Sequence, residues 1–291
     1  MSKEYKASKN SNDFFWSENF EDFSTEKARK YDYGVNQYAF GRELYDPMLV
    51  ELLQPYVGGE KLRILDAGGG TGKWSIYFAK MGHDVELLDV AEPMLAIAKE
   101  NTEKENCSDK VSIVKGSIDA LPYDDDAFDF VFSDRNPISH CGKKENAYTA
   151  ISELYRVLKP KGHIFGCVLN RYRKIAQLTM ELEFDKALEL FEEGHMQRSD
   201  LNYTYYFGLE ELKNKVFNVG FTDCTVIPTT ALTEFIPTAW LLDSIPLEKL
   251  YALENAARNV REMASFGVRF HFTAKKGWKL KTDKNWQHPC F

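Results

Sequence analysis

An acidic residue followed by a run of glycines is the part of this sequence best suited to bind a ligand. The segment reads DAGGGTGK over residues 66–73. Glycine permits sharp turns and lets the backbone approach a bound molecule closely. A helix that begins directly after such a turn adds unpaired amide hydrogens and a partial positive charge. The candidate binding residues are Asp66, Gly68, Gly69, Gly70 and Gly72.

Three glycine motifs compete for this loop. A phosphate-binding loop requires GxxxxGK followed by Ser or Thr, but Ala67 stands at the first glycine and Trp74 at the hydroxyl position. A dinucleotide fingerprint requires GxGxxG, and Lys73 stands where its third glycine belongs. An acidic residue followed by GxGxG does fit. A turn with a purely structural role remains the alternative.

Asp89 stands seventeen residues after Gly72, at the end of the next predicted strand. A carboxylate in that position can accept hydrogen bonds from both hydroxyls of a ribose. The alternative is a helix N-cap, because a helix is predicted to begin near Pro93. The spacing from the glycine loop favours the ribose interpretation.

The segment SDRNPISH, residues 133–140, follows the fourth predicted strand and contains the candidate catalytic residues. His140 is a candidate general base, since histidine titrates near neutral pH. Asp134 is a second candidate. The alternatives are an ordinary loop histidine and a local ion pair between Asp134 and Arg135. We expect no metal, because the five cysteines are scattered and show no metal-ligand spacing.

Strands and helices alternate regularly in the middle of the chain. Short apolar runs predict strands at 62–67, 85–90, 111–117, 128–133 and 163–170. Helical spacing predicts helices at 73–82, from Pro93 onward, and at 143–158. This alternation is typical of an α/β fold with a doubly wound parallel sheet covered by helices on both faces. Further helices are predicted at 174–195, 208–221 and 246–267, and further strands at 222–230 and 268–276.

Composition excludes several classes of protein. The 291 residues carry 37 basic and 44 acidic side chains, a net charge of −7, which argues against nucleic acid as a partner. We expect no membrane association, because no run of about 18 apolar residues occurs. The polar beginning of the sequence and the scattered cysteines favour a cytoplasmic location.

Four segments together resemble the class I S-adenosylmethionine-dependent methyltransferases. They read ILDAGGGTG, LLDVAEPMLAIAKE, KGSIDALPYDDDAFDFVFS and ELYRVLKPKGHI, and they span about residues 62–170. The resemblance implies a Rossmann-like, mostly parallel seven-stranded sheet. It also implies S-adenosylmethionine as the cofactor and S-adenosylhomocysteine as the product.

The resemblance also assigns roles to individual residues near the glycine loop. Asp66 and residues 68–72 would hold the methionine end of the cofactor. Asp89 would bind the ribose hydroxyls. Val90 and Met94 would flank the adenine.

Further roles fall on residues more distant in sequence. Ser117 and Ile118 would meet the adenine edge, although many relatives carry an acidic residue at the first of these positions. Ser133 would lie near the methionine carbons. Tyr31 or Tyr38 would close over the cofactor, with simple packing of an aromatic arm as the alternative.

The expected domain organisation follows from the same pattern. We expect an aromatic, partly helical arm over 1–57, a methyltransferase domain over 58–276 and a tail over 277–291. A helical lid insertion at about 171–207 would cover the acceptor. Its apolar and aromatic residues suit a small organic molecule, with ordinary core packing as the alternative. They are Met180, Phe184, Phe191, Tyr203, Tyr205, Tyr206 and Phe207.

The expected activity is methyl transfer to a small-molecule acceptor by in-line displacement. A methyltransferase that acts on a peptide or protein side chain is the alternative within the enzyme class. A non-catalytic S-adenosylmethionine-binding regulatory module is the alternative outside it. The acceptor atom and the oligomeric state do not follow from the sequence.

Overall fold

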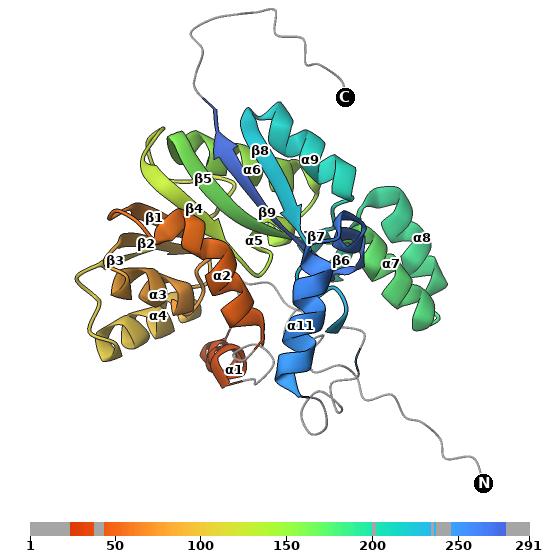
Figure 1. Ribbon diagram of the computed structural model, residues 1–291, viewed down its shortest axis with the longest axis horizontal. Coiled ribbons are helices and arrows are strands. Elements are labelled where there is room, and N and C mark those ends of the chain that lie inside the picture. Colours follow the sequence, from red (N-terminus) through yellow and green to blue (C-terminus); the bar gives the residue numbers. More distant parts are fainter. Residues whose placement is uncertain (1–23, 38–43, 200–201, 234–235, 237–245, 278–291) are drawn as a thin grey trace, which may run out of the picture.

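The computed structural model describes residues 24–37, 44–199, 202–233, 236 and 246–277. Seven strands form one sheet in the order β3-β2-β1-β4-β5-β9-β8. Figure 1 shows this sheet at the centre of the molecule. The strands are β1 Arg63–Ala67, β2 Asp84–Asp89, β3 Val111–Lys115, β4 Phe128–Ser133, β5 Leu158–Leu169, β8 Phe221–Ile227 and β9 Arg269–Lys276.

The sheet is mostly parallel. Strands β1 to β5 pair in parallel, and β9 runs antiparallel to both β5 and β8. The predicted fold class, a doubly wound α/β sheet of seven strands, is confirmed. Because β9 is antiparallel, its first residues lie beside the carboxyl ends of β4 and β5. Polar side chains from distant parts of the chain can therefore meet at this edge.

Helices cover both faces of the sheet because the central strands bury side chains of both parities. Phe130 points to one face and packs with Leu53 and Phe78, whereas Val131 points to the other and packs with Ile151 and Val216. The first face is covered by α2 Asp46–Val57, α3 Lys73–Lys80 and α4 Glu92–Lys104. The second is covered by α5 Pro137–His140, α6 Lys144–Val157 and α9 Leu209–Asn218.

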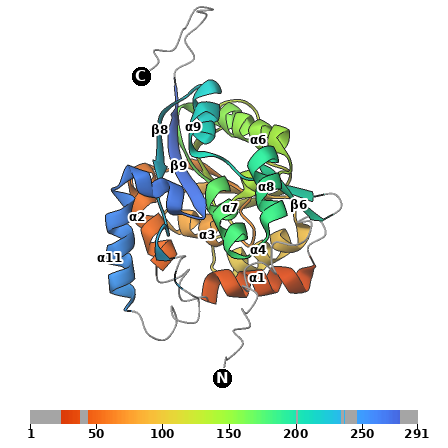
Figure 2. The same cartoon turned by 90° about the vertical axis from the view of Figure 1, so that its right-hand side faces the viewer.

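Helices occupy most of the described residues before the sheet, namely 24–37 and 44–57, whereas the rest of the predicted arm over 1–57 lies outside the described residues. Helix α1, Thr25–Gln37, contacts α4. Ala28 of α1 is buried against Met94 and Ile97 of α4. Arg29 adds a bidentate ion pair with Glu100, at 3.0 and 3.2 Å. Figure 2 shows α1 lying along α4.

Two predicted helices are broken in the structure. Instead of one helix over 174–195 there are two, α7 Arg171–Met180 and α8 Phe184–Glu193, because the chain turns at Leu182 with φ +62°. The predicted helix over 246–267 is α11 Leu247–Arg258 followed by a 3-10 helix, η4 Arg261–Phe266. A hairpin of β6 His195–Ser199 and β7 Asn202–Tyr205 was not predicted.

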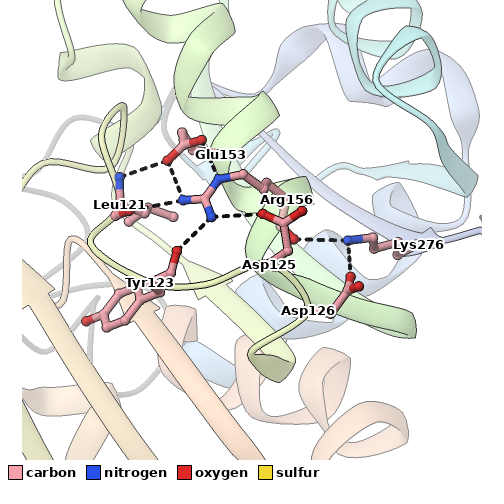
Figure 3. A network of polar contacts seen from close by, with 7 residues as sticks. All are labelled: Leu121, Tyr123, Asp125, Asp126, Glu153, Arg156 and Lys276. Carbon is pink, nitrogen blue, oxygen red and sulfur yellow. Dashed lines mark hydrogen bonds and ion pairs between the residues drawn. The ribbon is translucent and has the colours of Figure 1, made fainter.

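Arg156 of α6 fixes the loop between β3 and β4 (Figure 3). Its guanidinium donates to the carbonyl oxygens of Leu121 at 3.0 Å and Tyr123 at 2.6 Å. It also forms two hydrogen bonds of 2.7 Å with Glu153, whose carboxylate accepts from the Leu121 amide. A second carboxylate, Asp125, lies 3.2 Å away. The network therefore anchors the loop between β3 and β4, near whose start lie the candidate site residues Ser117 and Ile118.

Lys276 connects the far end of β9 to the same loop. Its buried ammonium group donates to Asp126 at 2.7 Å and to the backbone carbonyl of Arg156 at 3.0 Å (Figure 3). Asp126 has φ +58°.

Across the described residues, every helix is too short or too polar to span a membrane.

Candidate active site

The glycine loop connects β1 to α3, and steric demands explain why glycines occupy it. Gly68, Gly70 and Gly72 have φ of +81°, +55° and +86°, a region that side chains rarely adopt. A Cβ on Gly68 would overlap the ring of Pro137. The loop therefore combines backbone conformations that only glycine adopts without strain with close packing at Gly68, as a backbone that cradles a ligand requires.

Asp66 is buried beneath this loop at the end of β1. Its Oδ2 accepts a hydrogen bond of 2.6 Å from the Ser75 hydroxyl. Burial, together with the nearby charges of Asp134 and Asp89, raises the pKa of Asp66 to about 7, although the Ser75 hydrogen bond opposes this shift. At neutral pH the carboxyl group is therefore close to half ionised. A positively charged ligand group beside it would complete its ionisation.

Asp89 joins the glycine loop to the start of α4. Its Oδ2 accepts from the Gly70 amide and its Oδ1 accepts from the Ala91 amide, each at 2.9 Å. Burial raises the pKa of Asp89, and the backbone hydrogen bonds oppose that shift. The N-cap of α4 is Ala91 and receives no side-chain cap, so the N-cap interpretation of Asp89 is wrong. The ribose interpretation stays a prediction, with the carboxylate fixed against the candidate binding loop.

The other candidates for contact with the cofactor come from the arm, from α4 and from the residue directly after β2. Tyr31 of α1 packs with Met94, and its Cε1 lies 3.9 Å from where a Cβ on Gly70 would stand. Val90 is half-buried directly after β2. Tyr38 lies outside the described residues. The arm thus brings one of its two candidate aromatics to the glycine loop.

The candidate adenine edge contains an acid that the sequence interpretation missed. Ser117, just after β3, donates its hydroxyl to the carboxylate of Asp119, whose other oxygen accepts from Asn146 at 3.0 Å. Ile118 between them is buried. The acid that many relatives carry at the position of Ser117 stands two residues later in this chain, as Asp119. The signal in the sequence was therefore an acidic residue slightly further beyond the end of the strand.

Ser133 ends β4 with its side chain directed to the neighbouring strand. Its buried hydroxyl donates to the carbonyl oxygen of Ala67 at 3.0 Å. This bond connects the carboxyl ends of β1 and β4. Ser133 therefore lies between the glycine loop and the segment that holds the candidate catalytic residues.

Asp134 is the centre of a buried polar cluster drawn from four separate parts of the chain. Its Oδ1 accepts a hydrogen bond of 2.6 Å from the Tyr45 hydroxyl, and His271 Nε2 lies 3.2 Å from the same oxygen. His271 Nε2 also lies 2.8 Å from the Tyr45 hydroxyl, and its Nδ1 is hydrogen-bonded to the Thr229 hydroxyl. We call these four residues the Asp134 cluster. Among the described residues, Asp134 Oδ2 is buried without a hydrogen-bond partner.

The electrostatics of the Asp134 cluster favour an ionised carboxylate beside a neutral imidazole. Burial alone would raise the pKa of Asp134, but the His271 hydrogen bond, the Arg135 charge and the Tyr45 hydrogen bond hold it well below its usual range. Burial lowers the pKa of His271, against the opposing effect of Asp134. We assign the proton of the neutral ring to Nε2, because that nitrogen faces the negative oxygen.

Arg135 and Asn136 take unusual backbone conformations beside this cluster, with φ of +61° and +69°. The Arg135 guanidinium lies 5.2 Å from the centre of the Tyr45 ring, and that of Arg269 lies 5.6 Å from it. The Cys167 thiol lies 3.1 Å from Asn136 Oδ1. The strained segment after β4 is thus held on several sides.

Three potential metal ligands also meet here. Asp134, Cys167 and His271 each place one ligand atom within 4.8 Å of the others. Burial and the Asp134 charge raise the pKa of the Cys167 thiol far above its usual range. The thiol is therefore protonated as long as no cation is bound, whereas a bound cation would itself deprotonate a coordinating thiol.

The histidine that the structure places beside Asp134 is His271 rather than His140. His140 is the last residue of α5, and its backbone amide donates to the Asn136 carbonyl at 3.2 Å. His271 lies between two phenylalanines in β9, where side chains of both parities are buried. That pattern was the available signal, because a polar residue inside an apolar strand requires an internal partner.

The expected apolar wall of the lid is not formed as a unit. Met180, Phe184 and Phe191 are 67%, 54% and 61% exposed. Tyr205 and Phe207 are buried in the core on one face of the sheet. The aromatic stripe that the sequence suggested is therefore divided between the surface and the core.

Comparisons with known proteins come from sequence and from structure. Residues 64–162 match the family model described as a methyltransferase domain. The chain is 36% identical over 142 residues to a malonyl-[acyl-carrier protein] O-methyltransferase from Erwinia pyrifoliae, covering 49% of this chain and 48% of that protein. It is 35% identical over 108 residues to a ubiquinone/menaquinone biosynthesis C-methyltransferase from Pectobacterium carotovorum, covering 35% and 40%. The chain thus spans about half or less of these relatives' lengths.

Solved structures share the fold at low sequence identity. A phosphoethanolamine N-methyltransferase from Haemonchus contortus, solved with S-adenosyl-L-methionine, has a TM-score of 0.60 at 21% identity, covering 90% of this chain and 60% of that chain. A putative S-adenosylmethionine-dependent methyltransferase from Methanococcus maripaludis has a TM-score of 0.54 at 18% identity, covering 91% and 99%. These likenesses show a common fold.

Proposed function

Because residues 64–162 carry the methyltransferase domain of the class I S-adenosylmethionine-dependent family, we propose that this chain transfers a methyl group from S-adenosylmethionine to a small-molecule acceptor. One observation carries the proposal. Asp66, Gly70 and Asp89 come together at the carboxyl ends of β1 and β2, where folds of this type bind their ligands.

The residues at the glycine loop suit the cofactor. Asp66, with its raised pKa, gains a full charge when the ammonium group of the methionine end approaches it. A Cβ on Gly69 would stand 2.9 Å from Asp66 Oδ2 and fill the space beside the carboxylate. Asp89 would hold the ribose hydroxyls, and Tyr31 would cover the loop.

The adenine would lie between the ends of β2 and β3. Val90 and Met94 would flank the ring, and Ser117 and Ile118 would face its edge. The carboxylate of Asp119 supplies the acid that the serine lacks. The Arg156 network holds this loop in place, which fixes the edge before a ligand binds.

The cofactor, when bound, supplies a methyl group already activated by its positive sulfonium. The chain then has to hold a nucleophile in line with that methyl group, at about 3 Å, and exclude water. Ser133 lies between the two parts of the site and would contact the methionine carbons. The segment 134–140 would approach the acceptor.

Support for a small acceptor comes from the names of the relatives. They act on ubiquinone or menaquinone precursors in one case and on a malonyl group carried by acyl carrier protein in the other. A peptide or protein side chain is the alternative acceptor, and a binding module without turnover is the alternative activity. A cytoplasmic setting remains a prediction from the scattered cysteines, and the absence of a metal remains a prediction too.

Calorimetric titration with S-adenosylmethionine, S-adenosylhomocysteine and NAD tests the cofactor. We expect micromolar binding of both adenosyl ligands and its loss in Asp89→Ala. Asp84→Ala is the matched control, because Asp84 begins the same strand with its side chain 55% exposed and paired with Lys61 on the surface. Binding of NAD in place of the adenosyl ligands would overturn the proposal.

The acceptor class is tested with cofactor labelled on its methyl group. After incubation with a cell extract, label in the low-mass fraction or on a group carried by acyl carrier protein supports a small acceptor, and label on the amino-acid side chains of proteins supports the alternative. A folded protein that binds cofactor and transfers no label to either fraction supports the binding module.

A further inference from the structure

The Asp134 cluster places four polar side chains, one of them charged, in the interior of the protein, where apolar side chains would pack without this cost. All four residues are buried, with Asp134 5% and His271 0% exposed. A buried carboxylate costs several kcal/mol unless its oxygens are paired. Oδ1 has two partners, Tyr45 and His271, whereas Oδ2 has none among the described residues. One oxygen of a fixed, charged carboxylate thus has no hydrogen-bond donor among the described residues, and a bound ligand could supply one.

We propose that Asp134 Oδ2 receives the reacting group of the methyl acceptor, and that this group is an amine or a hydroxyl rather than a carboxylate. This inference rests on the proposed function. An N–H or O–H donor satisfies the remaining oxygen of an ionised carboxylate, while a second carboxylate would be repelled by it.

The position of Asp134 supports this role. Ser133, the preceding residue, is bonded to Ala67, so the end of β4 is fixed against the strand that leads into the glycine loop. Asp134 is also close enough to Asp66 to raise the pKa of that group. The carboxylate therefore lies beside the binding loop, on the side of the sheet edge that β9 and α2 enclose.

The backbone directly after Asp134 adopts conformations that are energetically unfavourable. Two successive residues, Arg135 and Asn136, adopt positive φ, which costs of order 1 kcal/mol for each non-glycine residue. Pro137 follows and begins α5. Strain of this kind persists where the surroundings hold a side chain in one required direction.

The bonds and charges balance for both nucleophiles. As the nucleophilic atom bonds to the methyl carbon, the carbon–sulfur bond breaks and sulfur keeps the electron pair. A hydroxyl passes its proton to Asp134 Oδ2. An amine keeps its proton and becomes a methylated ammonium ion, whose charge Asp134 balances. Tyr45 and His271 keep Asp134 ionised before the step.

The test uses sinefungin, a cofactor analogue that carries an ammonium group in place of the sulfur-bound methyl. We expect the wild-type protein to bind sinefungin roughly 10- to 100-fold more tightly than S-adenosylhomocysteine, as a charged hydrogen bond to Oδ2 implies. Asp134→Asn should remove this preference and leave S-adenosylhomocysteine affinity nearly unchanged. Asp124→Asn, an exposed residue of the β3–β4 loop, is the matched control and should retain it.

Tyr45→Phe provides a second variant in case Asp134→Asn does not fold. Loss of the Tyr45 hydrogen bond leaves Asp134 Oδ1 with one partner fewer and the carboxylate free to reorient, so the preference for sinefungin should weaken in this variant while the affinity for S-adenosylhomocysteine stays nearly unchanged. Both results together support the proposal.

Three outcomes overturn it. An unchanged preference in Asp134→Asn means that Oδ2 does not face the transfer position. Stoichiometric zinc that is lost in Cys167→Ser means that Asp134 serves a metal. Failure of the wild type to bind either adenosyl ligand removes the proposed function as well, which distinguishes that result from the other two.

Discussion

The glycine loop with its two acids and the Asp134 cluster differ in how the chain assembles them. Asp66, Gly70 and Asp89 lie within 24 consecutive residues, and one strand–turn–helix–strand unit brings them together. The Asp134 cluster draws its members from residue 45 to residue 271 and needs the antiparallel placement of β9 beside β5. The first site is therefore set by local backbone chemistry and the second by the register of the sheet.

The two regions also differ in charge, although both are buried. Burial raises the pKa of Asp66, whose direct partner is one neutral hydroxyl. The pKa of Asp134 falls despite burial, because His271, Arg135 and Tyr45 act on it together. The number and kind of neighbours, more than burial itself, decide whether a carboxyl group is poised to change its charge or fixed in one state.

Removal of His271 tests the contrast most severely. His271→Phe leaves Asp134 ionised with one partner fewer, and we expect the free energy of unfolding to fall by about 3 kcal/mol at neutral pH. Asp134→Asn combined with His271→Phe should cost less than His271→Phe alone, since the charge is gone. Urea denaturation measures both. His163→Phe, in half-buried surroundings of β5, is the control, and equal losses in the single and double variants would contradict a fixed charge.

The glycine loop should be sensitive to a single methyl group. In Gly68→Ala the new Cβ meets Pro137 in a left-handed backbone conformation, so we expect a loss of about 2 kcal/mol in unfolding free energy and weaker cofactor binding. Chemical denaturation and calorimetry measure the two effects. Gly59→Ala is the control, because nothing lies within 4 Å of its Cβ; a loss of equal size there would argue against the steric explanation.

Cofactor binding should depend on pH through Asp66. Because its pKa is about 7, the ammonium group of the cofactor binds a protonated carboxyl weakly, and affinity should fall by up to about tenfold for each pH unit below 7. Calorimetry in buffers of different ionisation enthalpy should show proton release on binding. Asp66→Asn should abolish both effects, and a flat profile in the wild type would count against the raised pKa.

The same group affects stability in the opposite direction. The folded-state pKa of about 7 lies above the unfolded value near 3.9, so the folded protein holds an extra proton between these values. The contribution of protonated Asp66 is fully present below about pH 4 and is lost as the pH rises through 7. Urea midpoints of the wild type and Asp66→Asn, compared across this range, measure it.

The smallest expected effect connects the two regions. The negative charge of Asp134 raises the pKa of Asp66, so Asp134→Asn should move the midpoint of the pH profile for cofactor binding downward by less than about one unit. Asp124→Asn should leave the midpoint in place. No shift in Asp134→Asn would mean that the two sites are electrically independent.

Much of the parallel sheet could be predicted from the sequence because its strands are apolar on both parities. The strand predicted at 85–90 runs from Asp84 to Asp89, and that predicted at 128–133 has the same bounds. The glycine loop was equally accessible, since its φ values demand glycine. Local signals of this kind survive without knowledge of the rest of the fold.

The missed features depend on contacts between distant residues. Leu182 adopts a positive φ, which is unusual for leucine. The residue type therefore gave no indication that the predicted helix breaks at that point. Lys73, used to reject a dinucleotide fingerprint, pairs with Asp46 of α2. His271 meets Asp134 only because β9 enters the sheet in reverse. Such pairings follow from topology and strand register, which a single sequence does not specify.

The close approach of Gly68 to Pro137 means that substitutions in the two regions depend on each other. No side chain fits at position 68 while proline occupies position 137. A redesign of the segment after β4 can therefore vary its other side chains, but a Cβ at position 68 requires a smaller or displaced residue at position 137. The two positions form an interlocked pair that has to be changed together.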